Sequence, residues 1–137
     1  MRTWLIDTGP VVAYLDQVDP AHHTSAETLD NFSGQLVTTS AVITETMHFV
    51  AGVPDGPMSL AEFVQASRMR IVESTQASQI LQAAVLMRKY SDTPMDFADA
   101  TLVLLADEVG ALDIVTLDRR GFSAYRTATG KRFRLVI

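Results

Sequence analysis

The chain has 137 residues, a length that fits one domain with a sizeable hydrophobic core. Hydrophobic residues make up 47% of it and charged residues 20%, which excludes a disordered chain and indicates a soluble globular protein. The absence of cysteine excludes disulfides, thiolate zinc sites and cysteine nucleophiles. No apolar run approaches the roughly 20 residues of a membrane-spanning helix, and no signal-peptide pattern is present. We therefore expect a single cytoplasmic domain over residues 1–137.

The net charge of −5 is unevenly distributed along the chain. Residues 119–137 contain six basic residues and no acid, so residues 1–118 carry −11. A basic segment on an acidic body can meet a polyanion locally. The alternative is a solvated surface strand or loop.

A first strand is predicted over residues 2–7, an apolar run that ends on Asp7 and is followed by a Gly-Pro turn. An acid at the carboxyl end of a strand lies where open α/β sheets place their binding sites. Pro10 fits the first turn of a following helix over residues 11–16. The alternative interpretation is that Asp7 only caps this helix, since Asp is a favoured N-cap residue.

The rest of the chain alternates between helices and strands. Helices are predicted over residues 20–32, 41–51, 58–67, 76–90 and 96–109, and strands over residues 36–39, 70–73, 112–116 and 132–137. Strands separated by helices imply right-handed crossovers. We therefore predict an α/β fold, a three-layer sandwich with a mainly parallel central sheet flanked by helices.

Two local expectations accompany these elements. Ser40 is expected to cap the helix at residues 41–51, because Ser is a favoured N-cap residue. The helix at residues 76–90 is expected to bury a face formed by residues spaced at three and four, namely Ile80, Ala83, Ala84 and Met87.

Four acids stand near the ends of predicted strands or in the helices that leave them: Asp7, Glu45, Asp99 and Asp118. The carboxyl ends of parallel strands share one edge of a sheet, so these carboxylates can converge on one crevice. Two unit charges about 5 Å apart repel by roughly 3 kcal/mol at an effective dielectric near 20, so such a cluster needs a cation. Oxygen ligands without cysteine or a His pair favour Mg²⁺ or Mn²⁺ over zinc, and such an ion suits phosphodiester hydrolysis.

Four short motifs then carry a resemblance to a known family. They are Trp4-Leu5-Ile6-Asp7-Thr8-Gly9-Pro10, Ser40-Ala41-Val42-Ile43-Thr44-Glu45, Asp96-Phe97-Ala98-Asp99-Ala100 and Thr116-Leu117-Asp118-Arg119-Arg120-Gly121-Phe122. Together they resemble a PIN-domain ribonuclease, and more closely the VapC-type toxins of toxin–antitoxin pairs. The resemblance covers essentially the whole chain, with the motifs in family order and at family spacing.

The resemblance implies a metal-dependent endoribonuclease that acts as the toxin of a type II toxin–antitoxin system. Asp7, Glu45, Asp99 and Asp118 match the family's acidic quartet. By the resemblance, Asp7 and Asp99 are the principal ligands of Mg²⁺ or Mn²⁺. Glu45 binds metal or positions the attacking water, and Asp118 holds a second ion or the waters of the first.

Several further residues are expected to support this site. By the resemblance, Thr8 and Thr116 support ligands or phosphate. Asp96, one turn before Asp99, adds an outer contact to the metal site or is the N-cap of its helix in a capping box. Arg119 and Arg120, beside Asp118, are expected to contact RNA phosphates.

One position departs from the family pattern. Gly121 stands where many relatives carry a further acid, which leaves the fourth site with fewer carboxylates.

The resemblance also implies partners: an RNA substrate, a small antitoxin protein and a second copy of the chain in a homodimer, with no membrane. Two other functions are kept as alternatives. One is a catalytically silent PIN fold that serves as an interaction module. The other is a metal-dependent phosphatase, whose chemistry needs an acid two residues after Asp7, where this chain has Gly9.

Overall fold

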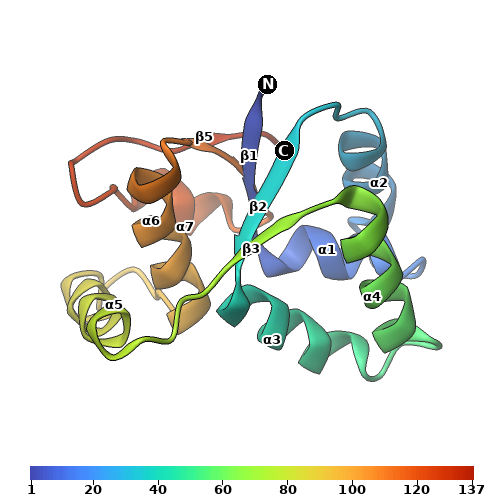
Figure 1. Ribbon diagram of the computed structural model, residues 1–137, viewed down its shortest axis with the longest axis horizontal. Helices are drawn as coiled ribbons and strands as arrows, with labels where there is room; N and C mark the ends of the chain where they lie inside the picture. The colour runs from blue at the N-terminus through green and yellow to red at the C-terminus, as the bar shows by residue number, and fades with distance from the viewer.

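The structure is a computed structural model that describes all 137 residues. Figure 1 shows a central sheet with helices on both of its sides. The strands are β1 (Thr3–Ile6), β2 (Gln35–Thr39), β3 (Arg70–Val72), β4 (Asp113–Val115) and β5 (Arg134–Leu135). The helices are α1 (Thr8–Leu15), α2 (His22–Asp30), α3 (Ser40–Val50), α4 (Gly56–Ser67), α5 (Ala77–Lys89), α6 (Phe97–Val109) and α7 (Arg119–Ala124).

The sheet has five strands in the order β3-β2-β1-β4-β5, and every pair of neighbours is parallel. Strand β1 occupies the centre, where Leu5 pairs with Val37 of β2 on one side and with Ile114 of β4 on the other. The carboxyl ends of β1, β2 and β4 therefore lie at one edge. The predicted mainly parallel sheet is confirmed.

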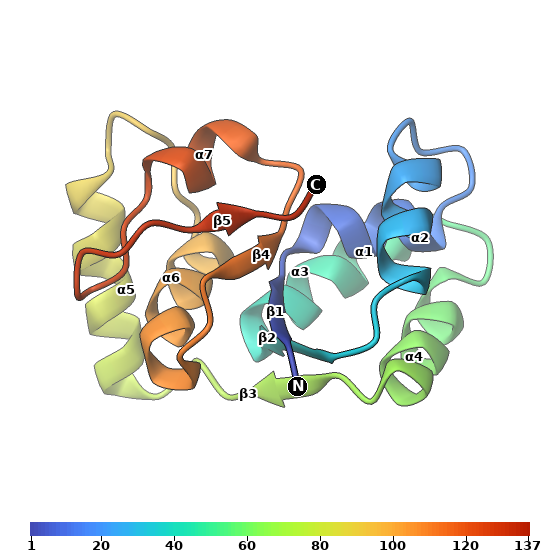
Figure 2. The same ribbon diagram turned by 90° about the horizontal axis from the view of Figure 1, so that it is seen from above.

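The helices form two layers that enclose the sheet. Helices α5, α6 and α7 cover one face, and α1, α2 and α4 cover the other, as the two views show (Figures 1 and 2). Each face has its own core: one gathers around Leu102, Leu105 and Phe122, and the other around Ile6 and Leu60. Helix α3 packs against α1, α4 and α6. The three-layer α/β sandwich is thus confirmed, and none of its helices has the length and apolar character of a membrane span.

The predicted elements recur with shifted ends, and one helix was missed. Helix α7 was not predicted, because six residues are too few to display a helical period. Helix α1 begins at Thr8, directly after its cap, earlier than expected. The last strand, β5, keeps only two of the six residues predicted for it.

The predicted buried face of α5 was wrong in two positions. Ala83 is fully buried and Met87 is half-buried, but Ile80 is 47% exposed and Ala84 is also exposed. Helix α5 packs chiefly against α6, so only a narrow stripe that includes Leu86 is covered.

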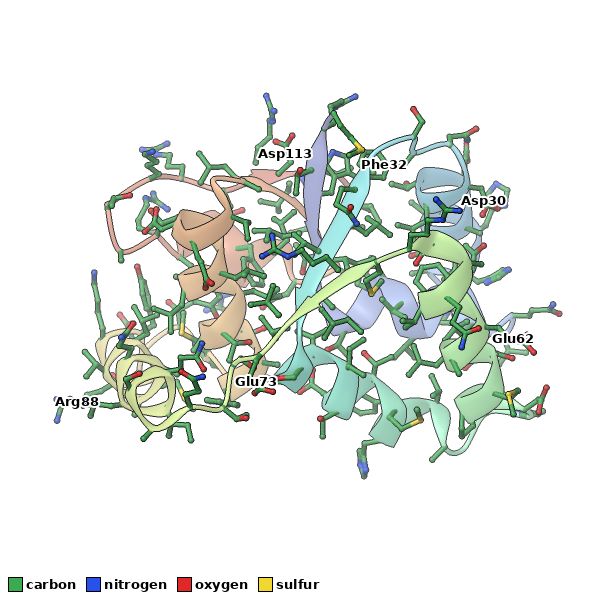
Figure 3. All side chains as sticks on the ribbon, in the orientation of Figure 1. Asp30, Phe32, Glu62, Glu73, Arg88 and Asp113 are labelled. Carbon is green, nitrogen blue, oxygen red and sulfur yellow. The ribbon has the colours of Figure 1, made fainter.

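The predicted cap of α3 was also wrong. The Thr39 hydroxyl, not that of Ser40, accepts from Val42 N at 3.3 Å. Ser40 Oγ instead donates to Glu73 Oε1 at 3.2 Å and lies 2.9 Å from Ser74 Oγ. Glu73 lies on the connection from β3 to α5, beside the start of α3 (Figure 3). The Ser40 side chain therefore ties two neighbouring connections together.

Candidate active site

Asp7 follows the central strand and is only 7% exposed. Its Oδ1 atom accepts a hydrogen bond from Thr8 N at 2.8 Å, so it caps α1. Its Oδ2 atom accepts from Thr116 Oγ1 at 2.8 Å, and its backbone N–H donates to Val115 O at 3.0 Å. The cap of α1 and the acid at the sheet edge are therefore the same carboxylate, so the capping role is confirmed and does not take Asp7 away from the sheet edge.

Thr116 links Asp7 to Asp118. Its hydroxyl oxygen accepts from Asp118 N at 3.0 Å while its proton is donated to Asp7. The Asp118 carboxylate then accepts from Gly121 N at 3.0 Å and so caps α7. A Cβ atom at position 121 would overlap Asp118 Oδ2 and lie 2.9 Å from Tyr125 Oη. The glycine is thus what lets the Asp118 carboxylate lie so close to the backbone.

Asp96 and Asp99 form a reciprocal capping box at the start of α6. Asp99 N donates to Asp96 Oδ1 at 2.8 Å, and Asp96 N donates to Asp99 Oδ2 at 3.1 Å. The expectation that Asp96 is the N-cap of this helix is confirmed. The pairing also fixes the Asp99 side chain, because one of its oxygens is held by the backbone.

Glu45 comes from the second turn of α3, which is anchored to α6 by two threonines. Thr101 Oγ1 donates to Ala98 O at 2.6 Å, so it accepts from Thr39 Oγ1 across 2.8 Å. Thr39 is the cap of α3 and Thr101 lies in the second turn of α6. This buried contact holds the helix of Glu45 against the helix of Asp99.

These acids surround one cavity of about 480 Å³ at the carboxyl edge of the sheet, which we call the acidic cavity. All four members of the predicted quartet line it, as do Thr8 and Asp96; its acids are Asp7, Asp19, Glu45, Asp96, Asp99 and Asp118. Thr116 does not line the cavity, but its hydroxyl bonds to the Asp7 carboxylate and to the backbone N–H of Asp118. Parallel strand ends thus bring together residues that are up to 111 positions apart in the sequence.

The acidic cavity makes several carboxylates harder to ionise. Burial raises the pKa of Asp7 to about 6, although hydrogen bonds from Thr116 and Thr8 oppose the rise. Burial raises the pKa of Asp99 to about 8, and the charges of Asp7 and Asp96 add to it. Burial and the Asp96 charge also raise the pKa of Glu45. Acids with such shifts in one cleft are a common mark of a functional site.

The donor set of the cavity fits a hard divalent cation that keeps part of its water. All donors are oxygens, and no three carboxylate or imidazole groups stand close enough to enclose an ion by themselves. The Thr8 hydroxyl is buried beside Asp7 and makes no hydrogen bond of normal geometry, although it lies near enough to Glu45 to oppose the rise of that acid's pKa. A buried hydroxyl without a partner suits a metal-bound water, and Mg²⁺ typically combines one or two carboxylates with several waters.

Asp19 lines the acidic cavity but was not predicted from the sequence. It belongs to the connection between α1 and α2, where its Oδ1 accepts from Ala21 N at 2.8 Å. It follows no strand, so the rule that identified the other acids did not reach it. The only sequence signal is a local one, an Asp two residues before the bonded amide in a turn with proline.

The two predicted RNA-contacting arginines lie outside the acidic cavity. Both are exposed in the first turn of α7, directly after Asp118. The Arg119 guanidinium donates to the Ile137 carbonyl, whereas the Arg120 side chain makes no hydrogen bond or ion pair. Elsewhere in the basic segment, Arg134 pairs with Asp113 of β4. Arg119 and Arg134 of the basic segment therefore contact other groups of the same chain, whereas the Arg120 side chain remains free to contact a ligand.

Comparison with known proteins gives the family. The PIN domain model matches residues 4–128. Ribonuclease VapC26 of Mycobacterium tuberculosis (strain ATCC 25618 / H37Rv) is 35% identical over 135 residues, which cover 96% of this chain and 98% of that protein.

Two solved structures share the fold. VapC20 of Mycobacterium tuberculosis, a toxin that cleaves the sarcin–ricin loop, superimposes with a TM-score of 0.75 and 18% identity over 84% of this chain and 89% of its own. VapBC2 of Rickettsia felis, bound to a DNA fragment from its promoter, superimposes with a TM-score of 0.64 and 13% identity. The match covers 97% of this chain and 98% of that chain. With a five-stranded parallel sheet, acids at its carboxyl edge and a match to the PIN domain model over residues 4–128, the chain belongs to the PIN-domain family, as a VapC-type member.

Proposed function

We propose that this protein is a Mg²⁺-dependent endoribonuclease that acts as the toxin of a toxin–antitoxin pair. The observation that carries the proposal is the acidic cavity, in which Asp7, Glu45, Asp99 and Asp118 converge at the edge of the parallel sheet. The similarity to VapC26, a ribonuclease, supports the reaction class.

Asp7 and Asp99 would hold the divalent cation, with Thr8 contacting one of its waters. Asp7 has the better-defined orientation, because Thr8 N and Thr116 Oγ1 fix both of its oxygens. A cation bound there lowers the pKa of a coordinated water and offsets the negative charge of a phosphate. Loading it requires that both acids lose their protons, which their raised pKa values oppose until the ion arrives.

We assign to Glu45 the role of positioning the attacking water and accepting its proton. It is half-buried on α3 and lines the same cavity as Asp7 and Asp99, and its raised pKa brings it nearer to the pH at which it would accept a proton. Asp118, which is held by the Gly121 amide, would orient further waters in the cavity. Arg120 would contact a phosphate of the RNA backbone beyond the cavity, which fixes register but carries no sequence information.

A cleavage assay with a matched set of variants tests this function. Purified protein should cut RNA in Mg²⁺ or Mn²⁺ and not in EDTA, and Asp7→Asn or Asp99→Asn should abolish cutting, because an amide keeps the shape but removes the charge that binds the cation. Asp92→Asn is the control, since Asp92 is exposed and outside the cavity. Folding of each variant is checked by its thermal melt.

Two results would contradict the proposal. Cleavage that persists in EDTA in both active-site variants would remove the metal mechanism. A folded wild-type protein that binds Mn²⁺ yet cuts no RNA would favour the silent interaction module.

We propose as well that a small antitoxin inserts an Arg or Lys into the acidic cavity. Such a cation would offset the same repulsion that a metal ion offsets, so inhibition should compete with Mn²⁺ binding. Co-expression with small proteins encoded beside this chain tests it: a true antitoxin suppresses toxicity and raises the solution mass, and the absence of both effects for every neighbour contradicts it.

The homodimer stays a prediction. Exposed apolar residues on α5 support it, namely Ile80, Leu81 and Val85. Sedimentation at several protein concentrations measures it, and a mass of one chain at all of them would contradict it.

A further inference from the structure

A second cavity, of about 580 Å³, adjoins the acidic cavity between α3 and the start of α6. We call it the flanking pocket; its side chains include Thr44, His48, Thr75 and Phe97, with Glu45 and Asp96. Glu45 and Asp96 also line the acidic cavity, so the two cavities share a wall. A nucleotide whose phosphate enters one cavity therefore has the other directly beside it.

The flanking pocket presents flat rings at its surface. Phe97 is half-buried at the first position of α6, and His48 is exposed on α3. Unpaired RNA bases stack on aromatic side chains and on His, which is how most single-stranded RNA is recognised by proteins. The rings favour a planar aromatic group over a phosphate.

Apart from His48, whose ring can donate or accept, the polar side chains of the flanking pocket act as hydrogen-bond acceptors. The Thr44 hydroxyl donates its proton to Ser40 O at 3.0 Å, and the Thr75 hydroxyl donates its proton to the Glu73 carboxylate. Each hydroxyl oxygen therefore has lone pairs but no proton left for a ligand. With the carboxylates of the shared wall, the pocket repels phosphate and selects a group rich in N–H donors.

We propose that the flanking pocket binds the nucleobase next to the scissile phosphate and selects guanine over uracil. This inference rests on the proposed ribonuclease function. Guanine presents two adjacent N–H donors on one edge, whereas uracil presents one N–H between two carbonyl oxygens. The acceptors of the flanking pocket can pair with both donors on this guanine edge but with only one N–H of uracil, and each hydrogen bond that is lost weakens binding.

Binding of free nucleosides tests the flanking pocket without any cleavage. The ring protons of the three histidines are followed by NMR during titration with guanosine or uridine. Neither nucleoside has a phosphodiester bond that the protein could cut. His22, which faces Ala13 O, and His23, which faces Glu27, act as internal references. Guanosine should shift the His48 signal saturably and bind at least about fivefold more tightly than uridine. Equal binding of the two nucleosides, or no shift of His48, overturns the inference.

Two variants and a control locate the site. Phe97→Leu should weaken guanosine binding about fivefold to a hundredfold by removing the stacking surface. Thr44→Val lies on an exposed helix position and should lower the preference for guanosine even if Phe97→Leu folds poorly. Phe63→Leu alters an equally half-buried phenylalanine on α4, outside the flanking pocket, and should bind as wild type. Wild-type binding by both pocket variants overturns the inference.

Mapping of cut sites gives a separate readout in RNA. Wild-type protein should cut mixed-sequence RNA with guanine enriched at one position beside the cut, and Thr44→Val should lose the enrichment with a raised KM and an unchanged kcat. Guanosine binding without any RNA cleavage would support the base-binding pocket and contradict the proposed ribonuclease function. RNA cleavage without guanosine binding would support the ribonuclease function and contradict the base-binding pocket.

Discussion

Thr116 Oγ1 donates a 2.8 Å hydrogen bond to Asp7 Oδ2, a contact that joins the ends of β4 and β1 across 109 positions of the sequence. The same hydroxyl oxygen accepts from Asp118 N, so one buried side chain sets the positions of two acids. Such a contact can be removed with little change in shape.

Thr116→Val should therefore weaken the metal site more than it weakens the fold. The substitution removes a donor to a buried carboxylate, for which we expect a stability loss of about 1–3 kcal/mol and a roughly tenfold weaker Mn²⁺ binding. Thr46→Val is the control, because its buried hydroxyl donates to Val42 O and to no acid. Calorimetric titration with Mn²⁺ and thermal melts measure the two effects. Equal metal affinity in both variants would contradict the prediction.

The metal-free protein should lose stability as the pH rises from about 4 to about 8. The folded pKa values of Asp7 and Asp99 are about 6 and about 8, above the unfolded value near 4. The folded state thus holds protons that the unfolded chain has released, and its stability falls through that window. In Asp99→Asn, the decline between pH 6 and 8 should disappear. Melts at pH 5, 6.5 and 8 test this, and a flat profile in wild type would contradict it.

Magnesium should reverse this loss at neutral pH. The ion binds the ionised native site and not the unfolded chain, so at a hundredfold excess over Kd it should add about 2.7 kcal/mol. Asp7→Asn should be more stable than wild type without metal at pH 8, yet nearly insensitive to added Mg²⁺. A wild-type melting temperature that ignores millimolar Mg²⁺ at pH 8 would mean that the acids do not bind it.

Gly121→Ala should impair cleavage without unfolding the protein. Alanine favours a helix over glycine by about 1 kcal/mol, but its Cβ would occupy the space of the Asp118 carboxylate. Asp118 must then turn away from the cavity, and we expect at least about a tenfold loss of cleavage rate, equivalent to roughly 1.4 kcal/mol. Gly52→Ala is the control, since no atom lies within 4 Å of its added Cβ. Identical rates for the two variants would remove the role given to Asp118.

Tyr125→Phe should weaken metal binding, because it removes the hydrogen bond from the Tyr125 hydroxyl to the Pro94 carbonyl. The buried Tyr125 hydroxyl donates to the Pro94 carbonyl and so ties α7, which begins after Asp118, to the segment that leads into Asp96. Tyr90→Phe is matched to it, because the Tyr90 hydroxyl accepts from Arg126 N at 3.0 Å and its ring packs 5.1 Å from that of Tyr125. Both variants should lose about 1 kcal/mol of stability, and only Tyr125→Phe should bind Mn²⁺ more weakly. Equal Mn²⁺ affinity in both variants would leave Tyr125 a purely structural role.

The spacing of the apolar residues and the positions of the acids after predicted strands were enough to predict the sheet and the convergence of the acids. Asp7 and Asp118 follow strands, and parallel strands put their ends at one edge, so the acidic cavity could be expected before any contact was known. The capping box of Asp96 and Asp99 was likewise readable from its spacing. These features depend on local chain order and on the sheet, which the pattern of apolar residues encodes.

Other features depend on packing between segments that are distant in the sequence. Whether Thr39 or Ser40 caps α3 is decided by Ser74 and Glu73, which occupy the Ser40 side chain from another connection. Asp19 lines the acidic cavity from the connection after α1, a segment that follows no strand. No spacing rule encodes such contacts, so their residues were missed.

The central place of β1 in the sheet has a consequence for how the proposed ribonuclease activity can be inhibited. Edge strands β3 and β5 are three and two residues long, whereas Asp7 N is bonded to β4 in the middle of the sheet. In native-state hydrogen exchange, the amides of β1 and α6 should open last, only with global unfolding, while the edges open by local fluctuation. Asp7 and Asp99 are thus attached to the segments that we expect to open least. We therefore expect the chain alone to keep the cavity around Asp7 and Asp99 assembled until it unfolds globally. Under the proposed toxin function, an antitoxin would act by occupying this assembled site, and its removal would free the site without a refolding step.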